Sequence, residues 1–160
     1  MKLDGFGGVA EFGSKDKVSP HFAFSEFCHD ENSICPPEFY ERLMRLAGVL
    51  EMLRKESQHK IWITSGYRSP ASNRRCGGAP HSQHLRGNAV DFRAVHHVDQ
   101  GKAHTNDKTA MLHGLVRKNA DLWGVGACGW YGAKEGRPLS RIHLDLRFRL
   151  PGEPIKTWVK

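Results

Sequence analysis

The spacing of apolar residues predicts a first amphipathic helix over residues 36–56. Apolar side chains recur there at intervals of three and four, which places them on one face of a helix. That face consists of Phe39, Leu43, Leu46, Ala47, Leu50 and Leu53. The segment opens with Pro36, Pro37 and Glu38, and both proline and an acidic residue are favoured in the first turn of a helix.

A second helix is expected from a cap at Thr105 or Asn106 to about Asn119, since both side chains can accept a hydrogen bond from the first helical turn. Its buried side is predicted to comprise Met111, Leu112, Leu115 and Val116. These residues again recur at helical spacing. Both helices are therefore expected to contribute an apolar face to the core.

Alternation of polar and apolar residues predicts a strand over residues 141–149. Successive side chains of a strand point to opposite faces, so His143 and Asp145 share one face with three arginines. The other face is directed into the interior and consists of Ile142, Leu144, Leu146 and Phe148. Three further short runs are predicted strands, near residues 61–65, 88–93 and 124–130.

The composition favours one globular domain. With 160 residues, of which 39% are hydrophobic and 26% charged, the chain is long enough to build one core. We expect an α+β fold over residues 19–160: a small, mostly antiparallel sheet with helices on one face and the polar residues on the other. Residues 1–18, rich in Gly and Lys, are expected to form an irregular arm.

No membrane span is expected, because no apolar run approaches the roughly 20 residues that cross a bilayer. The first residues also lack the apolar centre of a signal peptide. Export, where it occurs, is then expected to use another route or a segment outside this sequence.

The formal net charge of +7 and the pI near 9.4 predict attraction to polyanions. Nucleic acid is one such partner, and the bacterial wall with its acidic peptides and anionic polymers is another. A nucleic-acid binder is expected to carry a helix studded with Lys and Arg or an aromatic RNA-binding motif, and the sequence contains neither. We therefore expect no nucleic-acid partner, and the sequence does not indicate an oligomeric state.

The four cysteines, Cys28, Cys35, Cys76 and Cys128, form no CxxC pair, which argues against a thiolate zinc site. Cys28 and Cys35 bracket a short polar loop. They either close a small disulfide, as in proteins that work outside the cytoplasm, or remain free thiols.

The candidate chemistry rests on two histidines and an aspartate. His84 and Asp91 flank a glycine-containing turn, and Asp91 sits within the short apolar run 89–92. His143 lies on the polar face of the last predicted strand. If that strand neighbours the one carrying Asp91, the three side chains form a site of two imidazoles and one carboxylate. Such a site leaves a fourth position for water, as in catalytic rather than structural zinc sites.

Three segments carry a resemblance to a known family: Ser65-Gly66-Tyr67-Arg68-Ser69, Ser82-x-His84-x-x-Gly87-x-Ala89-x-Asp91-Phe92 and Ile142-His143-Leu144-Asp145. They resemble the zinc D-Ala-D-Ala carboxypeptidases and related peptidoglycan peptidases of the M15 family, whose fold is shared with the Hedgehog signalling domain. Together with the upstream segment 19–28, the motifs span most of the chain, and their order and spacing are specific as a set. The resemblance implies an M15-like peptidase domain over residues 19–160, with one zinc ion bound by His84, Asp91 and His143.

The resemblance also implies roles for Arg68 and Ser82. Arg68 is expected to hold a substrate carboxylate or a developing oxyanion, and a surface ion pair is the alternative. The hydroxyl of Ser82 is expected near the substrate, and capping of the turn is the alternative. His81 is not expected to be a ligand, since the motif spacing assigns that role to His84.

Peptide hydrolysis also needs a base that takes a proton from the attacking water and returns it to the leaving amine. In better-known members an acidic residue stands three positions before the last histidine ligand, where this chain has Ser140. Asp145 is the best local candidate, and it could equally orient His143 from behind the metal site. A loop acid such as Glu135 is a third alternative.

Three functions remain open on these observations. The first, which we favour, is a zinc metallopeptidase that cleaves peptidoglycan stem peptides or cross-links, as a D-Ala-D-Ala carboxypeptidase or a murein endopeptidase. It would act in the periplasm or cell wall, with phage-type delivery as one route. The second is a non-catalytic, zinc-containing wall-binding or interaction domain, supported by the missing acid at Ser140. The third is a basic nucleic-acid binder, supported by net charge alone.

Overall fold

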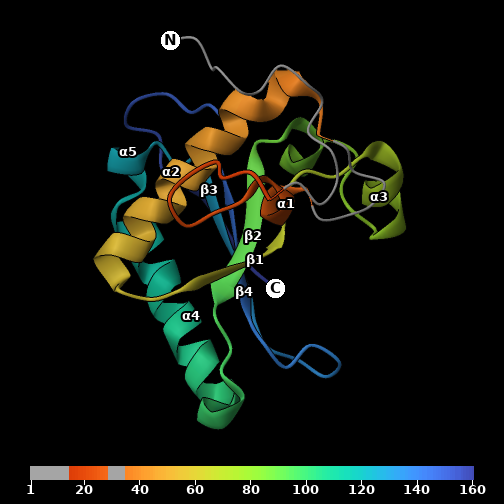
Figure 1. Ribbon diagram of the computed structural model, residues 1–160. Helices are drawn as coiled ribbons and strands as arrows, with labels where there is room; N and C mark the ends of the chain where they lie inside the picture. The colour runs from red at the N-terminus through yellow and green to blue at the C-terminus, as the bar shows by residue number, and fades with distance from the viewer. Residues whose placement is uncertain (1–14, 29–34) are drawn as a thin grey trace.

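The computed structural model describes residues 15–28 and 35–160. Within them, the centre of the fold is a five-stranded sheet in the order β1-β2-β4-β3-β5 (Figure 1). The strands are β1 (Ile61–Ser65), β2 (Ala89–Ala94), β3 (Ala127–Tyr131), β4 (Arg141–Asp145) and β5 (Lys156–Val159). The first four pair antiparallel with their neighbours, whereas β5 runs parallel to β3.

The sheet is therefore mixed, where the sequence predicted a mostly antiparallel sheet without β5. The reason lies in the connection after β4. This strand ends with Asp145 beside Ala127, and β5 begins with Lys156 beside the same residue on the other side of β3. Because β4 runs antiparallel to β3, a strand that starts where β4 ended must run parallel to β3.

The helices are α1 (Phe24–Phe27), α2 (Tyr40–Ser57), α3 (Pro70–Arg75), α4 (Gly101–Lys118) and α5 (Ala120–Trp123), with 3-10 turns η1 (Pro37–Phe39), η2 (Gln83–Arg86) and η3 (Val98–Gln100). Helices α2 and α4 are the two that the periodicity predicted. Helix α4 begins at Gly101 rather than after Thr105, because η3 leads directly into it. Helix α3 was not predicted. Its N-cap is Ser69, whose hydroxyl accepts a hydrogen bond from Ser72 N at 3.1 Å.

The core fills the space between one face of the sheet and helices α2 and α4. Its fully buried members include Leu43, Leu46, Leu50 and Leu53 of α2, Leu112 and Val116 of α4, and Val90, Phe92, Ile142 and Leu144 of the sheet. Two predictions of burial were wrong. Phe148 is 86% exposed because β4 ends at Asp145, so the alternation no longer directs it inward, and Met111 is 44% exposed on α4.

The segment before α2 is fastened to that helix. Phe22, Phe24 and Phe27 are buried, so these aromatics anchor the segment to the core. Glu51 of α2 accepts hydrogen bonds from Ser19 Oγ at 2.7 Å and from the backbone N–H of His21 at 2.8 Å. Residues 1–14 of the expected N-terminal arm lie outside the described residues.

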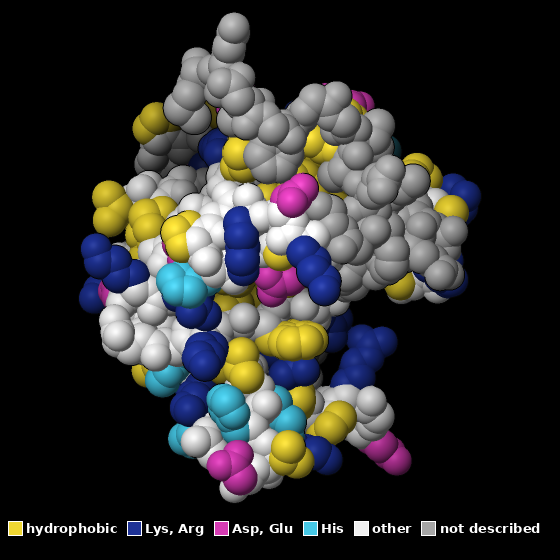
Figure 2. All heavy atoms as spheres, in the orientation of Figure 1, with side chains coloured by type: hydrophobic (Ala, Val, Ile, Leu, Met, Phe, Trp, Pro, Cys, Tyr) yellow, Lys and Arg dark blue, Asp and Glu magenta, His cyan; other side chains and the backbone are white. Residues whose placement is uncertain are grey.

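All four cysteines are free thiols, with Cys76 exposed and the other three buried. The loop between Cys28 and Cys35 lies outside the described residues. None of the helices in residues 15–28 and 35–160 combines the length and apolar character needed to cross a bilayer. Lys and Arg side chains are scattered over the face shown in Figure 2 and form no continuous stripe there.

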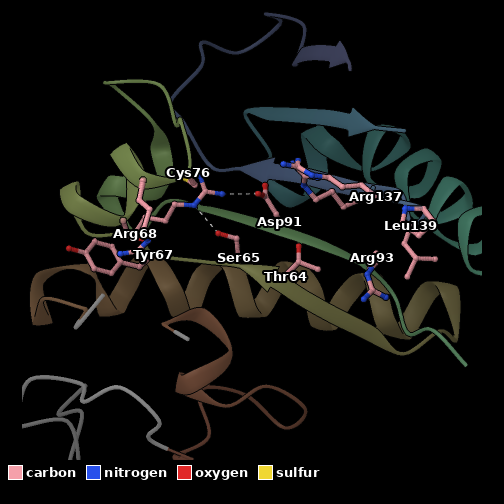
Figure 3. Close-up of a pocket in the computed structure, with 13 residues that line it drawn as sticks. Thr64, Ser65, Tyr67, Arg68, Cys76, Asp91, Arg93, Arg137 and Leu139 are labelled. Carbon is pink, nitrogen blue, oxygen red and sulfur yellow. Dashed lines mark hydrogen bonds and ion pairs between the residues drawn. The ribbon is translucent and has the colours of Figure 1, made fainter. Parts of the chain in front are cut away.

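Polar residues occupy the face of the sheet that the core leaves free. Asp91 of β2 and the alternating residues Arg141, His143 and Asp145 of β4 point to this face, because their neighbours Val90, Phe92, Ile142 and Leu144 point into the core. In Figure 3, α2 lies on one side of the sheet while Asp91 projects from the other. The two strands at positions two and three of the sheet thus carry the polar site.

Candidate metal centre

Three side chains from separate elements converge on the polar face: His84 from η2, Asp91 from β2 and His143 from β4. His84 Nε2 lies 3.2 Å from Asp91 Oδ1 and 3.3 Å from His143 Nδ1, and His143 Nδ1 lies 2.9 Å from Asp91 Oδ1. The strand register explains the meeting, because Asp91 is paired directly with His143. All three side chains are buried. The structure therefore brings together the three residues that the sequence singled out.

The carbonyl of Gly66 positions His84 from the side of the imidazole that faces away from Asp91, and its oxygen lies 2.7 Å from His84 Nδ1. Gly66 occupies a crowded position, since a Cβ atom there would lie 2.2 Å from the backbone oxygen of Phe27. The same Phe27 oxygen accepts a hydrogen bond from Tyr67 N at 2.7 Å. Glycine is required here because it allows this close approach, and the approach aims the Gly66 carbonyl at the imidazole.

Asp145 positions His143 from the side of the imidazole that faces away from Asp91, and its Oδ2 lies 2.9 Å from His143 Nε2. Arg147 donates to both oxygens of this carboxylate, from Nε at 2.8 Å and from Nη2 at 2.6 Å. Burial raises the pKa of Asp145, but the hydrogen bonds from Arg147 and His143 lower its pKa overall. Asp145 is therefore an ionised acceptor on the side of the imidazole that faces away from Asp91.

The hydrogen bonds fix where each histidine carries its proton. A carbonyl and a carboxylate only accept, so His84 carries its proton on Nδ1 and His143 on Nε2. The nitrogens that converge on Asp91 therefore present lone pairs. Three lone-pair atoms within 3.3 Å of one another repel unless a cation or a proton lies among them. Two imidazole nitrogens and one carboxylate oxygen form a donor set that fits zinc.

The ionisation of the two central groups agrees with this reading. When protons rather than a metal ion lie among these atoms, burial raises the pKa of Asp91, but the charge of a protonated His84 and hydrogen bonds from the protonated histidines lower its pKa far below the usual range. Burial lowers the pKa of His143, but hydrogen bonds with Asp145 and Asp91 raise its pKa overall. The centre thus favours a positive charge at the point where the three side chains meet.

Arg68 borders the centre from the loop after β1. Its Nη2 donates to Asp91 Oδ2 at 3.0 Å and its Nε donates to Ser65 Oγ at 2.9 Å (Figure 3). Each oxygen of Asp91 therefore has its own partner: Oδ1 faces the histidines and Oδ2 faces Arg68. Ser82 caps η2, because its hydroxyl accepts a hydrogen bond from His84 N at 3.3 Å.

The centre opens into a cleft of about 750 Å³, which Arg68, Ser82 and the exposed His81 also line. The basic residues of its walls are Arg68, Arg137, Arg141, Arg147, Lys156 and Lys160. Among the described residues that line it, Asp91 is the only carboxylate. Glu135 is not among them, and Ser140 is buried with its hydroxyl bonded to Asn106 Oδ1 at 3.0 Å. The cleft is therefore strongly positive around the centre.

Trp158 is a site residue that the sequence did not reveal. Its ring centroid lies 5.1 Å from that of His143, and it packs over Gly129, where a Cβ atom would lie 2.2 Å from the indole. Gly129 within a strand is the one sequence signal of this contact, because such a glycine often marks a close approach. That signal names no partner, so the position of Trp158 depends on β5, which was not predicted.

The sequence was also compared with known proteins. A family model described as Peptidase M15 matches residues 20–123, whereas no curated protein matches the chain. The matched region contains His84 and Asp91 and ends before His143, so the third member of the centre is placed by the pairing of β2 with β4. Because the match covers more than half of the sequence, this chain belongs to the M15 peptidase family.

Proposed function

We propose that this protein is a zinc-dependent peptidase that hydrolyses peptide bonds in the stem peptides or cross-links of peptidoglycan. The observation that carries the proposal is the buried set His84, Asp91 and His143 in an open cationic cleft, in a chain of the M15 peptidase family. These three residues would hold the metal. When bound, zinc supplies a Lewis acid for the scissile carbonyl and lowers the pKa of a coordinated water to about 7.

The protein's own groups prepare the ligands for this role. The Gly66 carbonyl and the Asp145 carboxylate keep the two histidines in the tautomers that present lone pairs to the metal. Arg68 orients Asp91, and it stands where a guanidinium can hold a substrate carboxylate or a developing oxyanion. Ser82 positions η2 and borders the path of the substrate.

Asp145 is, in this proposal, a positioning residue rather than the base. Both of its oxygens are engaged by Arg147, and the imidazole of His143 stands between it and the other two ligands. It is also completely buried and does not line the cleft. A base must reach the water that it deprotonates, directly or through one intervening water, and this position does not offer that reach.

A zinc-containing domain that binds the cell wall without cleaving it is the second candidate. The observation that favours it is the lining of the cleft, where Asp91 is the only carboxylate among the described residues. Under either candidate, residues 19–160 form the functional domain and the partners are peptidoglycan peptides in the periplasm or cell wall. The positive cleft suits such peptides because they carry free carboxylates.

The test measures zinc content and cleavage of purified peptidoglycan fragments, with and without a chelator, for the wild type, His143→Ala and the control His104→Ala. His104 is exposed on α4, away from the cleft. We expect one zinc per chain and zinc-dependent cleavage in the wild type and the control, and loss of both in His143→Ala. Zinc without cleavage of any fragment would favour the binding domain, and failure to bind any metal would exclude both candidates.

Zinc should also stabilise the fold, since a ligand that binds only the native state adds stability. At a free zinc concentration about 1,000 times the Kd, the gain is about 4 kcal/mol, or about 12 °C in Tm for a domain of this size. Thermal unfolding with zinc and with chelator measures this difference. His143→Ala should show almost none of it, while His104→Ala should show all of it.

A further inference from the structure

Two arginines beside the metal centre have no role in holding its ligands. Arg137 belongs to the loop between β3 and β4, and Arg141 is the first residue of β4. Both line the cleft that contains the centre, and both also line an adjoining pocket of about 560 Å³. In Figure 3, Arg137 lies on the same side of the sheet as Asp91 and across this pocket from Arg68. The two arginines therefore stand where the two hollows meet.

The positive charges of Arg137 and Arg141 are not balanced by acidic side chains of the described residues. Of the described residues that line the two hollows, only Asp91 has a carboxylate side chain, and its two oxygens already face the histidines and Arg68. Among residues 15–28 and 35–160, neither Arg137 nor Arg141 forms an ion pair. Like charges held together cost free energy unless an opposite charge joins them.

A ring contact holds the side chain of Arg141, and hydrogen bonds hold the backbone of the loop that carries Arg137. The guanidinium of Arg141 lies 4.3 Å from the ring centroid of Tyr131, a cation–π contact that restricts its orientation. The loop that carries Arg137 is closed by paired backbone hydrogen bonds with Lys134 at 2.9 Å. Asn106 of α4 ties the end of this loop, because it donates to Pro138 O at 3.2 Å and accepts from Ser140 N at 2.8 Å.

We propose that Arg137 and Arg141 form a second carboxylate subsite, which selects peptides that carry a free carboxylate away from the scissile bond. This inference rests on the proposed peptidase function and adds a substrate class to it. Arg141 precedes His143 by two residues on one strand, a separation of about 7 Å. A carboxylate held there lies about two extended residues from the bond at the metal. A guanidinium is suited to this role because it binds a carboxylate through two parallel hydrogen bonds.

The test uses three synthetic pentapeptides that differ in their number of free carboxylates. The first is L-Ala-γ-D-Glu-L-Lys-D-Ala-D-Ala, the second carries a carboxamide in place of the free carboxylate of D-Glu, and the third has diaminopimelate in place of lysine and so gains a carboxylate. Cleavage is measured as kcat/KM on the zinc-loaded protein. Binding is measured by calorimetry on the chelated protein, which does not turn the peptides over.

The variants are Arg137→Gln and Arg141→Gln, with Arg117→Gln as the control. Arg137 is exposed on a loop, so its replacement leaves the core intact, and Arg117 is exposed on α4 away from both hollows. We expect at least one carboxylate to improve binding by about tenfold or more, as for a charge-assisted hydrogen bond. Each cleft variant should lose that preference, and Arg117→Gln should keep it.

The outcomes separate this subsite from the peptidase itself. Charge-dependent binding that the two variants abolish, without any cleavage, would support the subsite and reject the peptidase. Cleavage with equal kcat/KM for all three peptides would reject the subsite and leave the peptidase. Tighter binding of a single-stranded oligonucleotide than of any peptide, weakened by the same variants, would overturn the subsite in favour of a nucleic-acid groove.

Discussion

Replacing Asp145 with asparagine distinguishes a positioning role from a proton-transfer role. The amide that replaces the carboxylate can offer its oxygen either to His143 Nε2 or to Arg147, and its NH2 group then faces the other donor. If NH2 faces His143, the imidazole proton must move to Nδ1, the nitrogen that points to Asp91. If NH2 faces Arg147, it takes the place of Oδ1 and opposes the Nε–H of Arg147, which is itself a donor.

The size of the effect follows from burial. Asp145 is completely buried, while the side chain of Arg147 is 30% exposed. Breaking a buried ion pair costs about 3–5 kcal/mol, and we expect about 3 kcal/mol because Arg147 can turn towards solvent. For a domain of this size that loss lowers Tm by about 9 °C. Zinc affinity should fall by about 10- to 100-fold, as for other partners of ligating histidines.

The assay measures zinc affinity by competition with a chelating dye, and then kcat at saturating zinc. For a positioning residue, the variant should bind zinc more weakly and recover most of its kcat once zinc is saturating. The control is Asp107→Asn, an exposed residue of α4, which should leave both quantities unchanged. Unchanged zinc affinity with a loss of kcat of about 100-fold or more is the signature of a missing base and would refute the reasoning.

Three further predictions concern the scaffold. Gly129→Ala should displace Trp158, which lowers stability by about 1–3 kcal/mol and shifts the tryptophan emission. Gly48→Ala has open space around its Cβ and should stabilise α2 by up to about 1 kcal/mol. Equal unfolding midpoints for the two variants would contradict this prediction. Burial raises the pKa of Glu51, but hydrogen bonds from the N-terminal segment lower it below 4.5 overall. The wild type should therefore be more stable than Glu51→Gln above pH 4.5, and this difference should vanish as the pH falls through the folded pKa of Glu51. Urea unfolding at several pH values measures the difference. A difference that does not change with pH would contradict a role for the ionisation of Glu51. Cys76 is the one exposed cysteine, so a thiol reagent should modify one thiol of the native protein quickly. Rapid reaction of a second thiol would contradict the burial of the other three cysteines.

The helices and the metal centre could largely be predicted from local pattern. The three- and four-residue spacing placed α2 and α4, and the period-two alternation placed His143 and Asp145 on one face of a strand. The pairing of Asp91 with His143 was only a condition of the predicted site, and the observed register of β2 and β4 meets that condition. The resemblance around Ser65 and His84 supported the same three residues and added the expected roles of Arg68 and Ser82.

The remaining parts of the site depend on contacts between distant segments. Strand β5 pairs at the sheet edge with residues 29 positions earlier (Ala127 and Lys156), and its short polar sequence shows no strong alternation. Trp158 could not be placed without it. The choice between two roles for Asp145 depended on the direction of its carboxylate and on Arg147. The loop with Arg137 is positioned by Asn106 of α4, a contact that no local pattern encodes.

The position of Lys160 has a practical consequence for handling the protein. Its backbone N–H donates to Trp130 O at 2.9 Å, its oxygen accepts from Gly132 N at 2.8 Å, and the residue lines the cleft. A polyhistidine tag fused directly after it would begin at the rim of the metal centre, where its imidazoles compete for the same ion. Metal stoichiometry and inhibition measured on such a fusion would describe the tag as much as the protein, so a removable affinity handle is the sounder choice.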